Sequence, residues 1–222
     1  MASRRPDMAA HRPAPRLYLV TPPMDEAAGF ARALADVLPV ADVAAVLLRL
    51  ADAAERELIN RAKAIVPVTE ARNVALLLDG HADIVLRAGA DGAHLTGVAA
   101  LRDAIAVLQP VRIAGAGGLR TRHDAMLAGE AGADYVMFGE PDADGRRPSF
   151  EAVMDRVAWW AEVFQPPCVG FAGAPDEVAP LARAGADFVA LGDWIWTAAP
   201  GPAAVVAAAA SQIAAMEPVA CA

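Results

Sequence analysis

Four side chains of this chain have the types and positions that acid–base or anion chemistry needs. Arg49, Asp79 and Glu140 each lie where a short apolar run ends, and His94 lies inside another such run. An arginine that ends a strand is expected to meet an anion or a carboxylate, and Asp79 is the candidate partner. His94, Asp79 or Glu140 can act as an acid or base, and Asp79 with Glu140 can hold a divalent metal. A histidine inside a strand is equally compatible with a structural place in the core.

The surrounding sequence predicts eight strand–helix units that would bring these side chains together. The expected strands are 16–21, 42–48, 74–78, 93–95, 111–114, a run ending at 138–139, 168–171 and a run ending at 192–193. The phrase Gly-Ala-Asp recurs before apolar runs, which indicates a repeated βα architecture. Eight parallel strands with covering helices close into a (β/α)8 TIM barrel, whose site lies at the carboxyl ends of the strands. We therefore expect a single α/β barrel domain over 16–222, preceded by a disordered lead-in, 1–15.

Glycines mark the same ends of several predicted strands. They are Gly117, Gly118, Gly139, Gly173 and Gly192, the last followed by Asp193. Loops after the seventh and eighth strands of such barrels commonly bind a phosphate with backbone N–H groups, and Gly173 and Gly192 lie there. Tight turns without a ligand explain these glycines equally well. An ionised Asp193 would repel a phosphate unless a cation balances it.

The polar segment 140–148 follows the sixth predicted strand. Its Arg146 and Arg147 are expected to form a solvated surface, and a lid that closes on an anion is the alternative. Trp194 and Trp196 lie just beyond the eighth strand, where they could form a wall of the pocket.

Composition narrows the range of partners and compartments. The chain has 222 residues, of which 56% are hydrophobic, and a formal net charge of −8. This charge argues against nucleic acid or an anionic membrane as the partner, but it permits a small anionic ligand. No apolar run has the roughly 18 residues of a membrane span, and 1–15 lacks the apolar core of a signal peptide. Cys168 and Cys221 have no metal-ligand spacing and indicate reduced thiols, so we expect a cytoplasmic protein, with a homodimer left open.

Several of these motifs resemble the thiamine phosphate synthase family. The matching stretches are 17–21, 89–95, 132–139 and the loop around Gly173, and the likeness runs from about Arg16 to Ile195. The related thiazole tautomerases share the same barrel. In the synthases, a pyrimidine pyrophosphate loses pyrophosphate with Mg²⁺ assistance, and the nitrogen of a thiazole phosphate attacks the resulting carbocation. The resemblance therefore implies a transferase of thiamine biosynthesis that binds phosphorylated heterocycles, with glycine amides after strands seven and eight holding the thiazole phosphate.

The departures from the family pattern concentrate on the pyrophosphate and its metal. Arg49 alone is kept from the run after the second strand, so the family's Lys and Gln are absent. Asp79 stands one position from the expected metal-binding Asp, and the loop 96–100 lacks the second one. Residues 117–119 are Gly-Gly-Leu where synthases carry a Ser and tautomerases a His, and Asp193 replaces a phosphate-binding Ser. By the resemblance, Mg²⁺ on Asp79 is expected to be weakly bound or absent.

Three functions follow from the residues and the resemblance. They are a thiamine phosphate synthase, an isomerase like the thiazole tautomerases that uses acid–base residues, and a barrel that binds a small thiamine-related ligand without catalysis. The candidate site comprises Arg49, Asp79, His94 and Glu140 for catalysis, Gly117, Gly118, Gly139, Gly173, Gly192 and Asp193 for ligand or phosphate binding, and Asp79 for metal binding.

Overall fold

The computed structural model describes residues 13–215, which form a closed barrel of eight parallel strands. The strands are β1 (Arg16–Val20), β2 (Val43–Leu48), β3 (Ala75–Asp79), β4 (Gly92–Thr96), β5 (Ile113–Gly117), β6 (Tyr135–Phe138), β7 (Cys168–Ala172) and β8 (Phe188–Leu191). Each strand pairs with its neighbours in chain order, and β8 pairs with β1 to close the ring. The predicted (β/α)8 TIM barrel is confirmed. Residues 1–12 of the predicted lead-in, and Cys221, lie outside the described part of the chain.

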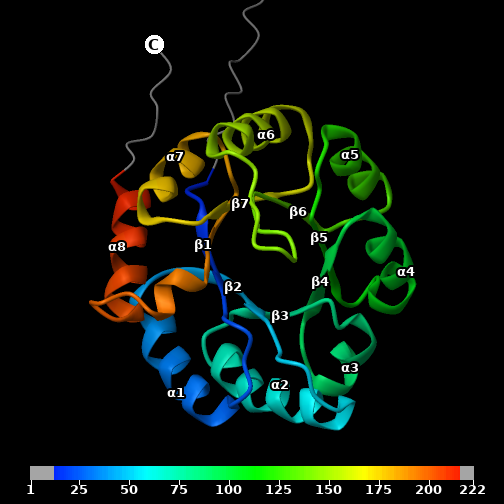
Figure 1. Cartoon of the computed structure of the whole chain (residues 1–222), viewed down its shortest axis with the longest axis vertical. Coiled ribbons are helices and arrows are strands. Elements are labelled where there is room, and N and C mark those ends of the chain that lie inside the picture. The colour runs from blue at the N-terminus through cyan, green and yellow to red at the C-terminus, as the bar shows by residue number, and fades with distance from the viewer. Residues whose placement is uncertain (1–12, 216–222) are drawn as a thin grey trace, which may run out of the picture.

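Helices surround the barrel on its outer side (Figure 1). They are α1 (Ala27–Val37), α2 (Glu55–Glu70), α3 (Val85–Ala88), α4 (Val98–Leu108), α5 (Arg122–Glu130), α6 (Phe150–Val163), α7 (Val178–Arg183) and α8 (Pro202–Ala214). Short 3-10 turns supplement them, namely η1 (Leu38–Val40), η2 (Ala82–Ile84), η3 (Pro175–Glu177) and η4 (Asp193–Trp196). Between residues 13 and 215, no helix has the length and apolar character needed to cross a bilayer.

The strands are buried on both faces, which is why they appear in the sequence as continuous apolar runs. Alternate residues such as Tyr18 and Val20 of β1 or Tyr135 and Met137 of β6 form a separate cluster inside the barrel. The residues between them, such as Leu17 and Leu19, belong to the larger core against the helices. This period of two follows from the alternation of side chains along a strand, so it fixes which residues can reach the interior.

The recurrent Gly-Ala-Asp phrase has a structural explanation. Each of its aspartates lies just before an even-numbered strand and accepts a hydrogen bond from a backbone amide at the start of the preceding strand. The three bonds, each 2.8 Å long, join Asp91 to Leu76, Asp134 to Ala114 and Asp187 to Cys168. A charged acceptor makes a stronger bond than a neutral one, so these aspartates fix the starting register of neighbouring strands.

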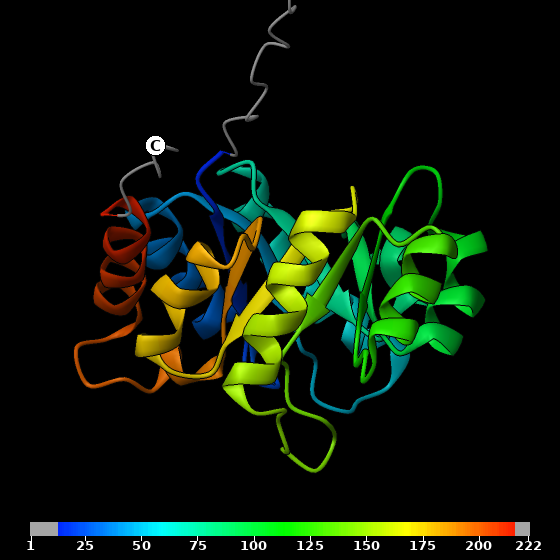
Figure 2. The ribbon, with the colours of Figure 1, turned by 90° about the horizontal axis from the view of Figure 1, so that it is seen from above.

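One glycine of β5 shapes the barrel interior beneath the site. A Cβ atom on Gly115 would lie 2.1 Å from the Tyr135 ring, which is closer than any side chain tolerates. The missing side chain therefore leaves room for the Tyr135 ring, whose hydroxyl group reaches past β5 to His94 on β4. The segment 139–148 after β6 projects from the end of the barrel to which the strands point (Figure 2).

Candidate active site

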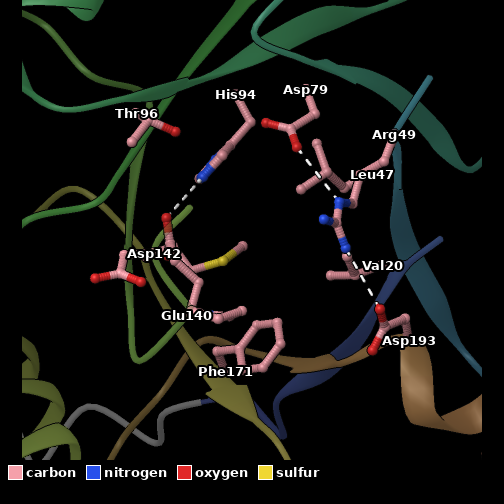
Figure 3. A pocket seen from close by; sticks show the side chains of 12 residues that line it. Val20, Leu47, Arg49, Asp79, His94, Thr96, Glu140, Asp142, Phe171 and Asp193 are labelled. Atoms are coloured by element: carbon pink, nitrogen blue, oxygen red, sulfur yellow. Dashed lines mark hydrogen bonds and ion pairs between the residues drawn. The ribbon is translucent and has the colours of Figure 1, made fainter. Parts of the chain in front are cut away.

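The four predicted catalytic side chains meet at the carboxyl ends of the strands. Arg49, Asp79, His94 and Glu140 line a cavity of about 110 Å³, together with Asp193 (Figure 3). An adjoining cavity of about 750 Å³ shares part of this lining and extends under the segment 139–148. The barrel therefore places these side chains around one small-molecule-sized hollow, as the βα order predicted.

His94 is fixed at both ring nitrogens. Its Nδ1 lies 2.9 Å from the Tyr135 hydroxyl group, and its Nε2 lies 3.2 Å from Oε1 of Glu140. The Tyr135 hydroxyl also lies 2.9 Å from that of Tyr18, so four side chains form one hydrogen-bonded chain from the barrel interior to the rim. Because His94 is 3% exposed, this chain of partners sets the orientation of the ring.

The charges around this chain favour a protonated imidazole. Burial lowers the pKa of His94, but the hydrogen bond and charge of Glu140, with the charge of Asp79, outweigh it and raise the pKa above its ordinary value. Burial also raises the pKa of both Tyr18 and Tyr135, so their hydroxyl groups stay protonated. The chain can therefore hold a proton on His94 while the tyrosines act only as hydrogen-bond partners.

Glu140 is placed by the glycines around it. Gly139 has a φ of 100°, a backbone conformation that favours glycine, and it turns the chain out of β6 just before Glu140. The amide of Gly118 donates a 2.7 Å hydrogen bond to Oε1 of Glu140. A Cβ atom on Gly117 would lie 1.8 Å from the same oxygen and 2.3 Å from Nε2 of His94. Oε2 of Glu140 is buried and has no hydrogen-bond partner among the described residues.

Arg49 lies between two carboxylates. Its Nε is 3.6 Å from Oδ2 of Asp79, and its Nη1 is 3.5 Å from Oδ2 of Asp193. The predicted meeting of Arg49 with Asp79 is confirmed. Arg49 also supplies the cation that balances Asp193 near the eighth strand.

The amides of Gly173 and Gly192 already have partners inside the protein. Gly173 N donates to Oε2 of Glu177 at 2.7 Å, and Gly192 N donates to the carbonyl oxygen of Ala172 at 3.1 Å. Phosphate binding at these two glycines stays a prediction, and it would require at least the Glu177 carboxylate to leave.

The two adjacent arginines of the segment 140–148 have different environments. Arg146 is exposed and pairs with Asp144, in agreement with a solvated surface. Arg147 is not solvated in this way, because it donates to the carbonyl oxygens of Gly139 and Phe171 and pairs with Glu177 at 2.9 Å. The expectation of two solvated arginines was wrong for Arg147, since Phe171 and Glu177, which supply two of its three acceptors, lie 24 and 30 residues away in the chain and no local pattern indicates them.

The two tryptophans also differ from the prediction. Neither lines the two cavities, because Trp194 Nε1 donates to the carbonyl oxygen of Ala172 and Trp196 Nε1 to that of Val20. Both side chains therefore tie the turn after β8 to the ends of neighbouring strands.

The donor set around Asp79 does not fit Mg²⁺. Magnesium binds through one or two carboxylates with near-ideal octahedral geometry. Asp79 is already paired with Arg49, and no carboxylate lies in the loop 96–100 that follows β4. From residue 13 to 215, no group of three or more His, Cys, Asp or Glu side chains could hold a metal ion. The Arg49 guanidinium group thus lies beside the Asp79 carboxylate, on the side where a metal ion would have to bind.

Three residues of the site escaped prediction from sequence. Tyr135 orients His94, Tyr18 continues the chain, and Glu177 reaches the glycine after β7. The period of two along β6 places Tyr135 inside the barrel with Met137, and that signal could have found it. Nothing local in the sequence indicates that Glu177 turns back toward Gly173.

The family model and the curated relatives that match this chain indicate the same family. The family model described as thiamine monophosphate synthase matches residues 17–195. The chain is 40% identical over 195 residues to a thiamine-phosphate synthase of Rhodospirillum centenum, covering 86% of this chain and 94% of the relative. It is 35% identical over 213 residues to that of Hyphomonas neptunium, covering 91% and 95%. The structure of a thiamine phosphate pyrophosphorylase from Pyrococcus furiosus superimposes with a TM-score of 0.75 at 20% identity over 91% of this chain and 97% of that one, which supports the fold.

Proposed function

Since this chain belongs to the thiamine monophosphate synthase family, we propose that it works in thiamine biosynthesis on a heterocyclic thiamine precursor bound at the barrel rim. The members of this family are transferases. The alignments with the two named relatives cover nearly the whole length of each relative. We propose a small-molecule ligand and a cytoplasmic location for the protein.

The His94–Glu140 pair is the observation that carries the proposed chemistry. Glu140 has one oxygen held by His94 and Gly118, and the other oxygen is buried without a protein partner. In this proposal a small side-chain movement turns Oε2 into the cavity that Glu140 lines, where it takes a proton from a bound heterocycle and returns it at another atom of the ring. Atoms and charge balance in such an isomerisation, because the same proton leaves and re-enters the ligand.

Arg49 and His94 would support this proton transfer. Arg49 faces the same cavity, and its guanidinium group is a cation available to negative charge that develops on the ring. The imidazole holds the carboxylate in place through Nε2–H, and Tyr135 holds the imidazole in turn. This isomerase-type reaction needs no metal, which agrees with the donor set around Asp79.

The condensation catalysed by the family is the second candidate. Arg49 favours it, because Arg49 is the one group kept from the family's pyrophosphate-binding run and it faces the cavity. When bound, Mg²⁺ supplies charge neutralisation for a departing pyrophosphate in that reaction. Neither Asp79 nor its neighbours in this chain fit that ion.

A thermal-shift screen in EDTA tests the ligand part of the proposal. Thiamine, its phosphates and the two half-substrates should be compared, because a ligand of the folded state raises the unfolding temperature with its concentration. At least one should stabilise the wild type, and His94→Gln should abolish the effect while His123→Gln, the same change at an exposed histidine, should not. If none of the compounds stabilises the protein, the proposed ligand class is wrong.

Isotope exchange tests the chemistry. The stabilising heterocycle should take up deuterium from D₂O at one ring position in the presence of protein, and Glu140→Gln should stop this uptake. An unchanged exchange rate in Glu140→Gln would exclude the proton transfer proposed for this carboxylate.

A further inference from the structure

A carboxylate of this chain occupies the place where barrels commonly bind a phosphate. The loops after the seventh and eighth strands usually receive that anion through backbone N–H groups. Here Oε2 of Glu177 accepts the Gly173 amide at 2.7 Å and lies 2.9 Å from Nη2 of Arg147. Oε1 of Glu177 lies 3.4 Å from Nη1 of the same arginine, so the guanidinium group contacts both oxygens. One amide and one bidentate arginine are the donors that a phosphate would use.

The room in front of both glycines is filled as well. A Cβ atom on Gly173 would lie 1.8 Å from Nη1 of Arg147, so the guanidinium group rests directly against this glycine. A Cβ atom on Gly192 would lie 2.8 Å from the Phe171 ring, and Arg147 stacks over that ring at 5.2 Å from its centroid. Arg147 and Phe171 together cover the end of the barrel between β7 and β8.

The charges at the β7–β8 end of the barrel disfavour binding of a further anion. Glu177 and Arg147 are 15% and 24% exposed, and each satisfies the charge of the other. Asp193 and Asp176 add negative charge on the flanking turns, and only Asp193 of these two has a cation beside it, Arg49 at 3.5 Å, among the described residues. An entering phosphate would have to displace a carboxylate that the chain holds in place at a high effective concentration.

We infer that Glu177 is a specificity-determining residue that excludes phosphate from the β7–β8 end of the site. The inference rests on the proposed function for the identity of the ligand, and it narrows that ligand to a heterocycle whose end at β7–β8 is uncharged, such as a free alcohol. The phosphorylated form of the same heterocycle is the ligand that Glu177 rejects.

Binding of inorganic phosphate tests the exclusion without any thiamine compound. Phosphate affinity should be measured by calorimetry or phosphorus NMR for the wild type, Glu177→Ala, Glu177→Gln and the control Asp176→Asn, which removes a nearby exposed charge. Glu177→Ala should bind phosphate at least tenfold more tightly than the wild type and the control. Adding Arg147→Ala to Glu177→Ala should remove this gain. Should Glu177→Ala unfold, Glu177→Gln keeps the side-chain shape and should still show a gain.

Two outcomes would overturn the inference. Neither Glu177 variant gains phosphate affinity, which means that no anion site lies beneath the carboxylate. Alternatively, the wild type binds phosphate as tightly as Glu177→Ala and depends equally on Arg147, which means that Glu177 yields to phosphate.

A pair of matched ligands extends the test to specificity. The thiazole alcohol should stabilise the wild type more than its phosphate ester does at equal concentration, and Glu177→Ala should reverse this order. The same order in both proteins would contradict the inference. Failure of the proposed function is distinguishable, because neither thiazole would then bind while the phosphate titration would still report on Glu177.

Discussion

Replacing Tyr135 with phenylalanine should destabilise the barrel more than the same replacement at Tyr18. Both rings lie inside the barrel, with Tyr18 at 2% and Tyr135 at 6% exposure, and each variant removes one hydroxyl group. The difference lies in the partners. The Tyr135 hydroxyl is bonded to both Tyr18 and Nδ1 of His94 at 2.9 Å, whereas Tyr18 is bonded to Tyr135 alone.

The size of the effect follows from the number of buried groups left without a partner. Tyr18→Phe leaves the Tyr135 hydroxyl with His94 still in place, so the loss is one hydrogen bond of about 0.5–1.5 kcal/mol. Tyr135→Phe strands the Tyr18 hydroxyl and the imidazole Nδ1, and each unsatisfied buried group costs about 1–3 kcal/mol. We therefore expect a loss of about 2–6 kcal/mol in the free energy of unfolding for Tyr135→Phe.

Urea unfolding at neutral pH measures both variants and the double variant. The double variant should be less destabilised than Tyr135→Phe alone, because removing the Tyr18 hydroxyl also removes one buried group without a partner. Equal losses for the two single variants, or a larger loss for Tyr18→Phe, would refute the claim that Tyr135 connects the barrel interior to His94.

Three further variants probe the same site. Gly117→Ala should abolish stabilisation by the heterocycle in a thermal-shift assay. The new Cβ atom would lie 1.8 Å from Oε1 of Glu140, and this oxygen would have to move by about 1.2 Å to reach the 3.0 Å separation that real Cβ atoms keep. Undiminished stabilisation would contradict the placement of Glu140. The pKa of His94 is raised in the folded state, so its protonation contributes stability that is full below the ordinary value of 6.5 and is lost as pH rises through the higher folded pKa. The free energy of unfolding measured with urea should therefore fall over this pH range in the wild type and show no such step in Glu140→Gln. Arg147→Ala should lower the free energy of unfolding in urea by about 2–3 kcal/mol, because it leaves Glu177 without its cation. The loss is smaller than for a fully buried ion pair, and adding Glu177→Ala should restore part of it.

The sequence was sufficient for the barrel because its signals are local and repeated. The solid apolar runs, and the aspartates that start even-numbered strands, recur often enough to define the order of units. Once the barrel is known, strand ends must converge, so the order of units alone was enough to place Arg49, Asp79, His94 and Glu140 around one cavity.

Contacts between side chains on distant strands were beyond that reasoning. The fit of Tyr135 against Gly115 depends on ring position inside the barrel, and the pairing of Arg147 with Glu177 depends on the paths of two loops. Trp194 was predicted to wall the pocket, but its indole N–H is satisfied by a carbonyl oxygen that only the fold brings near. For these residues, the position in the sequence predicted which end of the barrel each one occupies. The hydrogen-bond or ion-pair partner of each one depends on three-dimensional packing.

The rate of thiamine phosphate formation from the pyrimidine pyrophosphate and the thiazole phosphate tests most directly the claim that the residues around Asp79 do not fit Mg²⁺. Purified protein should be assayed with saturating Mg²⁺ and again with EDTA. Removing one electrostatic contact to a transition state commonly costs about 10²–10³ in rate, and this site lacks several of them. We predict formation close to background and unaffected by EDTA. Turnover of about 1 s⁻¹ or faster that EDTA abolishes would contradict the account and would show that Asp79 leaves Arg49 to hold the metal.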